Sequence, residues 1–399
     1  MKKLLLIISI VSVFASSVYA FEPIQLGENA YLKIFYDTQF GLTYRDTGTG
    51  VMNNEAALNL NFRRNRLGFI GTYNDVLSFY FQTEYIENKV INPLSISDQP
   101  NQNFYVLDAQ VRYDPFDFLR FQLGKFKHNL TRENLEACFE PLTLDRSLFI
   151  NTTFQTSRDI GVAVWGNILD GWIQYRVDVM DGKTGRSGDL FEAGMSQFRY
   201  TGRLQFSLLE DKETSYGMKG TYRGNKKQVL TIGGAVQYEP NVVYTDALNL
   251  TGEKDYFAYS VDIFYEQNFE NVGVFTASAA YLDINMGDAY KGQFASVESY
   301  GQNGQKRGYY VKIGYMLPNI PLQFFARYDN YYFARLDSKN QAFYNQNISW
   351  VGAGFNYYID GQNIKITAQY SRTMFSKQDP NDPNYRDFNT VELYTQFRF

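Results

Sequence analysis

The last nine residues of the chain, 391–399, read VELYTQFRF. Every second residue belongs to one set, which is Val391, Leu393, Thr395, Phe397 and Phe399. The residues between them are charged or carry a polar group. Because neighbouring side chains of a β-strand point to opposite faces, this alternation predicts a strand with one apolar face and one polar face. Thr395 is the single polar member of the apolar set.

The same period of two recurs along the chain after residue 20, with little sign of a helical period. Residues 30–44, for example, read AYLKIFYDTQFGLTY, in which Leu32, Ile34 and Tyr36 share one face. This pattern predicts an all-β protein. We predict sixteen strands, at residues 30–44, 57–72, 75–86, 103–114, 118–127, 158–167, 171–181, 198–208, 228–238, 255–268, 272–285, 307–317, 321–332, 348–359, 362–372 and 389–399.

The connections between these strands alternate in length. Short turns fall near residues 73–74, 114–117, 167–171, 268–271, 317–321 and 360–363. Long connections cover residues 87–102, 128–157, 182–197, 239–254, 286–306, 333–347 and 373–388. Outer-membrane barrels have short turns at one end and long loops at the other, so we predict a transmembrane antiparallel β-barrel of about 16 strands. Residues 209–227 are an exception, a long connection on the short side.

Other all-β architectures fit this pattern less well. A soluble sandwich rarely places so many strands in one sheet. A propeller would show a repeat of roughly 40–50 residues, and none is visible.

The N-terminus predicts the compartment. Lys2 and Lys3 precede an apolar run at 4–14, and small or short residues follow at Val18 and Ala20. This is the pattern of a secretory signal peptide over residues 1–20, which leaves residues 21–399 as one barrel domain. The terminal strand resembles the last strand of bacterial outer-membrane proteins, which the barrel assembly machinery recognises. We therefore expect a place in the bacterial outer membrane, in contact with its lipid and lipopolysaccharide, and an assembly signal at Phe397 and Phe399.

The residues of catalytic chemistry are almost absent. The chain has one cysteine, Cys138, and one histidine, His128, so an intramolecular disulfide and a usual zinc site are both excluded. No GxSxG nucleophile motif accompanies the histidine. We expect no enzyme activity, no cofactor and no nucleic-acid partner. Cys138 is interpreted as a small packed residue and His128 as a residue of the pore rim.

Several fragments resemble the phosphate-selective porin O and P family. They are NFRRNRLGFIG (61–71), LDAQVRYDPFDFLRFQLGKFK (107–127), DRSLF (145–149), SRDIGVAVWG (157–166) and GYYVKIGYMLPNIPLQFFARYD (308–329). Their shared order makes the match specific, and they are spread over nearly all of the mature chain. The resemblance implies a sixteen-stranded barrel, usually a homotrimer, that passes small anions. It also implies that the third loop, about 128–157, folds into the lumen and narrows it.

The inward face of the barrel should carry the charged residues. The basic residues in inward phase are Lys33, Arg112, Arg176, Arg203, Lys312, Arg327, Lys365 and Arg398. The acidic residues in that phase are Asp37, Glu84, Asp108, Asp178, Asp262, Glu266, Asp329 and Glu392. The two sets are equal in number, eight each, so we expect many of these charges to pair across neighbouring strands as part of the wall.

The fragment 61–71 adds three arginines, Arg63, Arg64 and Arg66. Its apolar residues change parity between Phe62 and Leu67, which predicts a β-bulge near 63–66. An arginine facing lipid at mid-bilayer would cost about 2–4 kcal/mol, so at least two of the three should point inward. With the basic residues beside the third loop, the predicted pore-lining or anion-binding set is Arg63, Arg64, Arg66, Lys125, Lys127, Arg158, Arg112, Arg203 and Arg327.

These observations favour a porin for passive diffusion of small hydrophilic solutes, with a preference for phosphate-like or other small anions. A weakly selective general porin is the alternative, because the inward charges balance and the third loop also carries acidic residues. A plugged barrel that serves as an adhesin or surface scaffold is a further alternative, and it would conduct no ions.

Overall fold

The computed structural model describes residues 22–50, 54–86, 103–148, 150, 157–182, 198–246, 251–285, 306–333, 346–378 and 386–399. The predicted signal peptide, residues 1–20, lies outside them, as does the predicted long loop 87–102. The strands are β1 (Ile24–Gln25), β2 (Ala30–Thr49), β3 (Glu55–Tyr73), β4 (Leu77–Ile86), β5 (Asn103–Phe116), β6 (Leu119–Lys127), β7 (Arg158–Ile168), β8 (Ile173–Met180), β9 (Arg199–Ser207), β10 (Gln228–Asp246), β11 (Thr251–Phe269), β12 (Gly273–Asn285), β13 (Lys306–Met316), β14 (Leu322–Phe333), β15 (Gln346–Asp360), β16 (Ile364–Phe375) and β17 (Phe388–Arg398).

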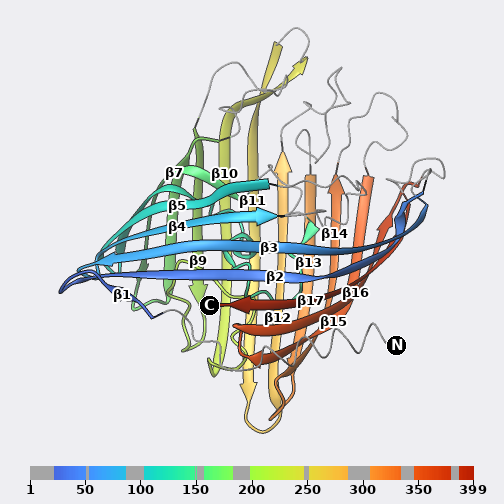
Figure 1. Cartoon of the computed structure of the whole chain (residues 1–399). Helices are drawn as coiled ribbons and strands as arrows, with labels where there is room; N and C mark the ends of the chain where they lie inside the picture. The colour runs from blue at the N-terminus through green and yellow to red at the C-terminus, as the bar shows by residue number, and fades with distance from the viewer. Residues whose placement is uncertain are drawn as a thin grey trace.

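The strands β2 to β17 close into one antiparallel barrel (Figure 1). Each pairs with the next in the chain, and β17 pairs with β2, so that Leu393 lies opposite Leu42. This confirms the predicted barrel of sixteen strands. The short β1 pairs only with β2, as an addition at the end of the wall. Closure leaves no unpaired strand edge, which is what a lipid environment requires.

Several strands are longer than predicted, most clearly β2, β10 and β11. The prediction ended a strand at residue 238, two residues before Pro240, and proline cannot donate a ladder hydrogen bond. In the structure, β10 continues past this proline, and the register with β11 shifts between Glu239 and Val243. A bulge thus accommodates the proline, and β10 and β11, with 19 residues each, are much longer than β6 to β9, which have 8 to 11 residues (Figure 1).

The two faces of the wall follow the alternation in the sequence. Leu204, Val236 and Val261 are exposed on the outer face, whereas their inward neighbours Arg203 and Asp262 are buried. An apolar outer face suits contact with lipid tails, and inward polar groups suit water and one another. Among the described residues, no helix is long and apolar enough to cross a membrane.

The third loop folds into the lumen, as predicted. It begins with the short helix α2 (Arg132–Leu135), whose N-cap is Thr131: the Thr131 hydroxyl accepts a hydrogen bond from the backbone N–H of Asn134 at 3.1 Å. Farther along, Asn356 of β15 donates to the carbonyl of Leu142 at 2.8 Å. The loop therefore crosses from the β6 side of the barrel to the opposite wall.

A second segment enters the lumen from the other end of the barrel. It is the connector, residues 208–227, between β9 and β10. The backbone N–H of Met218 donates to the carbonyl of Leu135, and the Met218 carbonyl accepts from the N–H of Ala137. The connector and the third loop thus form one hydrogen-bonded unit inside the barrel, which explains why the turn at 209–227 is long.

A buried ion pair reinforces this unit. The guanidinium of Arg132 in α2 forms two hydrogen bonds to the Glu213 carboxylate of the connector and lies over the ring of Phe264. Tyr216 of the connector packs edge-on against Trp165 of β7, with ring centroids 5.2 Å apart. The third loop and the connector thus pack together inside the barrel and against its wall.

Candidate functional site

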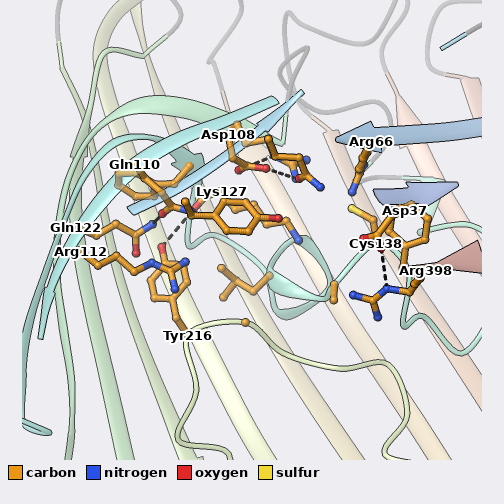
Figure 2. Close-up of a pocket in the computed structure, with 18 residues that line it drawn as sticks. Asp37, Arg66, Asp108, Gln110, Arg112, Gln122, Lys127, Cys138, Tyr216 and Arg398 are labelled. Atoms are coloured by element: carbon orange, nitrogen blue, oxygen red, sulfur yellow. Dashed lines mark hydrogen bonds and ion pairs between the residues drawn. The ribbon is translucent and has the colours of Figure 1, made fainter. Parts of the chain in front are cut away.

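A cavity of about 190 Å³ lies between the barrel wall and the two inner segments (Figure 2). Strands β2 to β7 and β17 provide its wall side, and the third loop and the connector provide its inner side. A second cavity of about 220 Å³ shares three of its residues, Asp37, Tyr80 and Arg398. The two cavities are therefore neighbours along the same wall, and we refer to them together as the passage.

Basic side chains outnumber carboxylates on the 190 Å³ cavity. Its five cations are Arg66, Arg112, Lys127, Arg158 and Arg398, and its two carboxylates are Asp37 and Asp108. Each cation comes from a different strand of the wall. The surface that a solute would meet is therefore predominantly positive.

Three of the five cations are held by carboxylates. Arg158 binds Asp108 through two hydrogen bonds of 3.1 Å. Arg398 approaches Asp37 at 3.2 Å and also donates to Glu140 at 2.9 Å. These pairs fix the guanidinium groups in place and neutralise part of their charge.

The third pair joins Arg66 to Glu84 at 2.6 Å. Like Glu140, the Glu84 carboxylate is not among the groups that face the cavity. Glu84 and Glu140 therefore hold the guanidinium groups of Arg66 and Arg398 from outside the cavity.

Arg112 and Lys127 are in a different situation. Within the described residues, neither makes an ion pair with a carboxylate. The Arg112 guanidinium lies over the ring of Tyr216, 5.5 Å from its centroid, and the Lys127 ammonium donates to the backbone carbonyl of Glu136 at 2.5 Å. The Tyr216 hydroxyl in turn donates to the carbonyl of Lys127 at 3.2 Å. These two cations carry the charge of the passage that no carboxylate offsets.

The side chains that the third loop adds to the inner side of the cavity are mainly apolar. The third loop contributes Leu135, Ala137, Cys138 and Phe139 to it. The Phe139 ring receives Arg66, with 5.1 Å from the guanidinium carbon to the ring centroid. Charges from the wall thus face an apolar surface across the passage.

Cys138 is buried, as predicted for a packed residue, but it also lines the cavity. Arg146 donates to its Sγ at 3.2 Å. Burial raises the pKa of the Cys138 thiol, but Arg146, Arg66 and Lys127 together bring it well below its usual value. These cations therefore favour the thiolate form of Cys138, an effect that no sequence motif indicated.

The predicted bulge is present in the arginine strand. Phe62 lies opposite Phe40 and Arg64 opposite Gln39, so Arg63 is the extra residue. Arg63 pairs with Asp145 of the third loop, and Arg64 donates to Gln39 at 2.7 Å. With Arg66 on Glu84, all three arginines point inward.

Two predicted residues lie on the far wall instead. Arg203 binds Asp262 through two hydrogen bonds of 2.7 Å. Arg327 binds Asp329 at 2.8 Å and donates to the Asp145 carbonyl at 2.7 Å. Arg203 thus links two strands of the wall, and Arg327 links the wall to the third loop. Neither arginine lines the cavity.

Lys125 and His128 also differ from expectation. Lys125 shares the parity of the exposed Leu123, and its ammonium donates to the carbonyl of Val106 at 2.8 Å. The structure therefore places Lys125 on the outward side of β6, away from the other basic residues. His128 is buried, with 8% of its surface exposed, and so it is not a rim residue.

The predicted pore-lining set did not include the amide side chains of the passage. Gln82, Gln110 and Gln122 come from β4, β5 and β6, and Gln122 donates to Gln110 across the strands. Part of their signal was available, because Gln82 stands two residues from the predicted inward charge Glu84, and Gln110 stands between Asp108 and Arg112. Isolated amides carry no motif, however, and only the cross-strand register brings them together.

Comparison with known proteins agrees with this architecture. A family model described as "Phosphate-selective porin O and P" matches residues 34–399. An uncharacterized protein of Aquifex aeolicus (strain VF5) is 23% identical over 273 residues, which cover 65% of this chain and 61% of that protein. The chain thus spans about three fifths of the length of this relative.

Solved porins have the same fold. The outer membrane channel DcaP of Acinetobacter baumannii superposes with a TM-score of 0.58 at 15% identity, over 95% of this chain and 100% of that chain. Salmonella typhi OmpF, in complex with daunomycin, superposes with a TM-score of 0.59 at 14% identity, over 95% of this chain and 100% of that chain. Pseudomonas putida OprB gives 0.57 at 10% identity, over 92% of this chain and 94% of that chain.

Proposed function

Because the chain belongs to the phosphate-selective porin O and P family, we propose that its channel prefers small anions over cations. The protein is an outer-membrane porin, a channel without enzymatic activity. The geometry of the passage supports the proposed preference for anions over cations. Small inorganic or organic anions would cross by diffusion along the wall of β2 to β7.

One observation carries this proposal: five cations face the cavity against two carboxylates, and Arg112 has no carboxylate partner among the described residues. A guanidinium stays protonated at every accessible pH, so Arg112 is a permanent positive charge. Rings and ladders of Arg and Lys favour anions in pores, because the local potential at the narrowest part sets the selectivity. The net charge of the whole chain matters far less.

The test is the reversal potential of the folded protein in planar bilayers under a potassium chloride gradient. We expect a potential that reports chloride permeating more readily than potassium. Arg112→Gln should lower the chloride-to-potassium permeability ratio. Lys125→Gln is the matched control, because it removes the same charge from the outward face of the adjacent strand, and it should leave the ratio unchanged. A reversal potential that favours potassium in the native protein would refute the proposal.

The weakly selective general porin remains the second candidate. The ion pairs of Arg66, Arg158 and Arg398 favour it, because a paired guanidinium attracts a passing anion less strongly. This candidate predicts a permeability ratio near one and no response to Arg112→Gln. A plugged scaffold predicts no conductance at all. The two cavities along one wall argue for a narrow open passage instead.

We further propose that the porin assembles as a homotrimer in contact with lipid and lipopolysaccharide. Membership of the family supports this proposal, because porins of this family are usually homotrimers. Electrophoresis without heating should give a band of three chains, and a single-chain band under mild detergent would contradict the trimer.

A further inference from the structure

The passage has two chemically different sides. The wall side carries the guanidinium and ammonium groups together with the amides of Gln82, Gln110 and Gln122. On the inner side, the stretch 135–139 of the third loop contributes Leu135, Ala137, Cys138 and Phe139, and the connector adds Tyr216 and Gly217. We call the stretch 135–139 the apolar side. The one carboxylate of this stretch belongs to Glu136, and it turns toward Arg132 at 3.7 Å instead of toward the cavity.

The connector holds the apolar side in this orientation. Backbone hydrogen bonds from Met218 to Leu135 and from Ala137 to Met218 flank Glu136 on both sides. The Phe139 ring faces a wall cation, as its contact with the Arg66 guanidinium shows, and Leu135 and Ala137 line the same cavity. Three of the four side chains that this stretch adds to the cavity are therefore hydrocarbon groups, which offer no hydrogen bond to a solute.

We infer that the passage selects small organic anions, those with a carboxylate on a compact apolar body, over hydrated inorganic anions and over hydroxylated carboxylates of the same size. This inference rests on the proposed anion preference and specifies its substrate class. The carboxylate would meet Arg112 and the glutamine amides on the wall. The hydrocarbon body would lie against the Ala137 and Phe139 side.

The physical reason is the cost of unsatisfied polar groups. A phosphate or a hydroxylated anion carries oxygens on all sides, and those that face the apolar stretch lose water without gaining a donor. A methyl group in the same position loses nothing and removes apolar surface from water. The cavities of about 190 and 220 Å³ are large enough for a body of a few carbons.

Isobutyrate and lactate form a matched pair of probes, because they differ only by a methyl group in place of a hydroxyl. Bi-ionic reversal potentials of the native porin, with chloride on the opposite side, give the permeability of each anion. We expect isobutyrate to exceed lactate by about 3-fold to 10-fold, less than the effect of one methyl group in a closed apolar pocket because the passage is wet. Inorganic phosphate should permeate less well than isobutyrate.

The variant Ala137→Ser tests whether the preference for isobutyrate arises at the apolar side of the passage. Ala137→Ser adds one hydroxyl to the apolar side and should bring the isobutyrate-to-lactate ratio close to one, while the chloride-to-potassium ratio stays as in the native protein. Ala109→Ser is the control, because Ala109 lies on the outward face opposite Lys125. Chloride conductance of both variants verifies that each forms a pore.

Three outcomes would overturn the inference. These are equal permeability of isobutyrate and lactate, a preference for phosphate, and an isobutyrate preference that survives Ala137→Ser. The chloride-to-potassium permeability ratio of the same protein distinguishes failure of this inference from failure of the proposed function. A ratio that favours chloride, combined with equal permeability of the two organic anions, would leave the anion-preferring porin intact and remove only the substrate class.

Discussion

The single cysteine of the chain lines the passage and serves as a natural reporter of its potential. We predict that a negatively charged methanethiosulfonate reacts with Cys138 faster than a positively charged reagent of similar size. The reagents share the same chemistry, so their intrinsic reactivity can be measured on a small free thiol and divided out. The remaining ratio reports the local field alone.

The expected size of the effect follows from the two cations without a carboxylate partner, Arg112 and Lys127. At one Debye length, about 8 Å, a unit charge in water contributes about 0.5 kcal/mol before screening and about 0.2 kcal/mol with it. Two cations contribute twice this amount, and reversing the sign of the reagent doubles it again. The anionic reagent should therefore react about 4-fold to 30-fold faster, since about 1.4 kcal/mol corresponds to a factor of ten.

The assay follows the decline of chloride current in planar bilayers after each reagent is added. Cys138→Ser should abolish the decline and so prove that the reaction occurs at this thiol. Equal corrected rates, or faster reaction of the cationic reagent, would refute the positive passage. A thiol that neither reagent reaches would show that the cavity is closed to solutes.

Three further predictions concern the inner segments and the last strand. Arg132→Ala leaves Glu213 buried without its partner and should lower the free energy of unfolding by about 3–5 kcal/mol, measured by urea titration of the porin in lipid vesicles. Burial raises the pKa of Glu136 to about 7 against the opposing effect of Arg132, so the carboxyl is charged at pH 8 and mostly neutral at pH 6. Chloride preference should therefore rise as pH falls, and Glu136→Gln should weaken this dependence in reversal-potential measurements. Phe399 stacks on Tyr36 and exchanges two backbone hydrogen bonds with it, so Phe399→Ala should reduce the amount of heat-modifiable barrel recovered from outer membranes.

The barrel was predictable because a period of two is a local property. Each strand shows its two faces within a few residues, and turn length then orders the strands into a barrel. One strand end was predicted too early, at residue 238, because the bulge by which β10 continues past Pro240 depends on pairing with β11. The inward direction of Arg63, Arg64 and Arg66 was likewise readable, since the parity change is visible in the sequence itself.

The passage was only partly predictable, because it depends on contacts between distant segments. Arg203 and Arg112 have the same inward phase, and only the register shows that Asp262 binds the first while the second stays without a carboxylate. Lys125 was assigned to the pore from its nearness to the third loop, although its parity with Leu123 indicated the outward face. Nothing local to 209–227 indicates that this segment joins the third loop.

The bulge at Arg63 also sets the orientation of the two halves of β3. Leu58 and Leu67 both face outward although an odd number of positions separates them, so a strand of this length without the bulge would turn one half inside out. That change would expose arginine to lipid, or leucine to the lumen, at a cost of about 2–4 kcal/mol for each charge placed in lipid. Deleting Arg63 would instead leave a regular strand with both halves in their present orientation. The backbone shape at this point, more than the identity of any one side chain, therefore decides which face of the strand meets lipid.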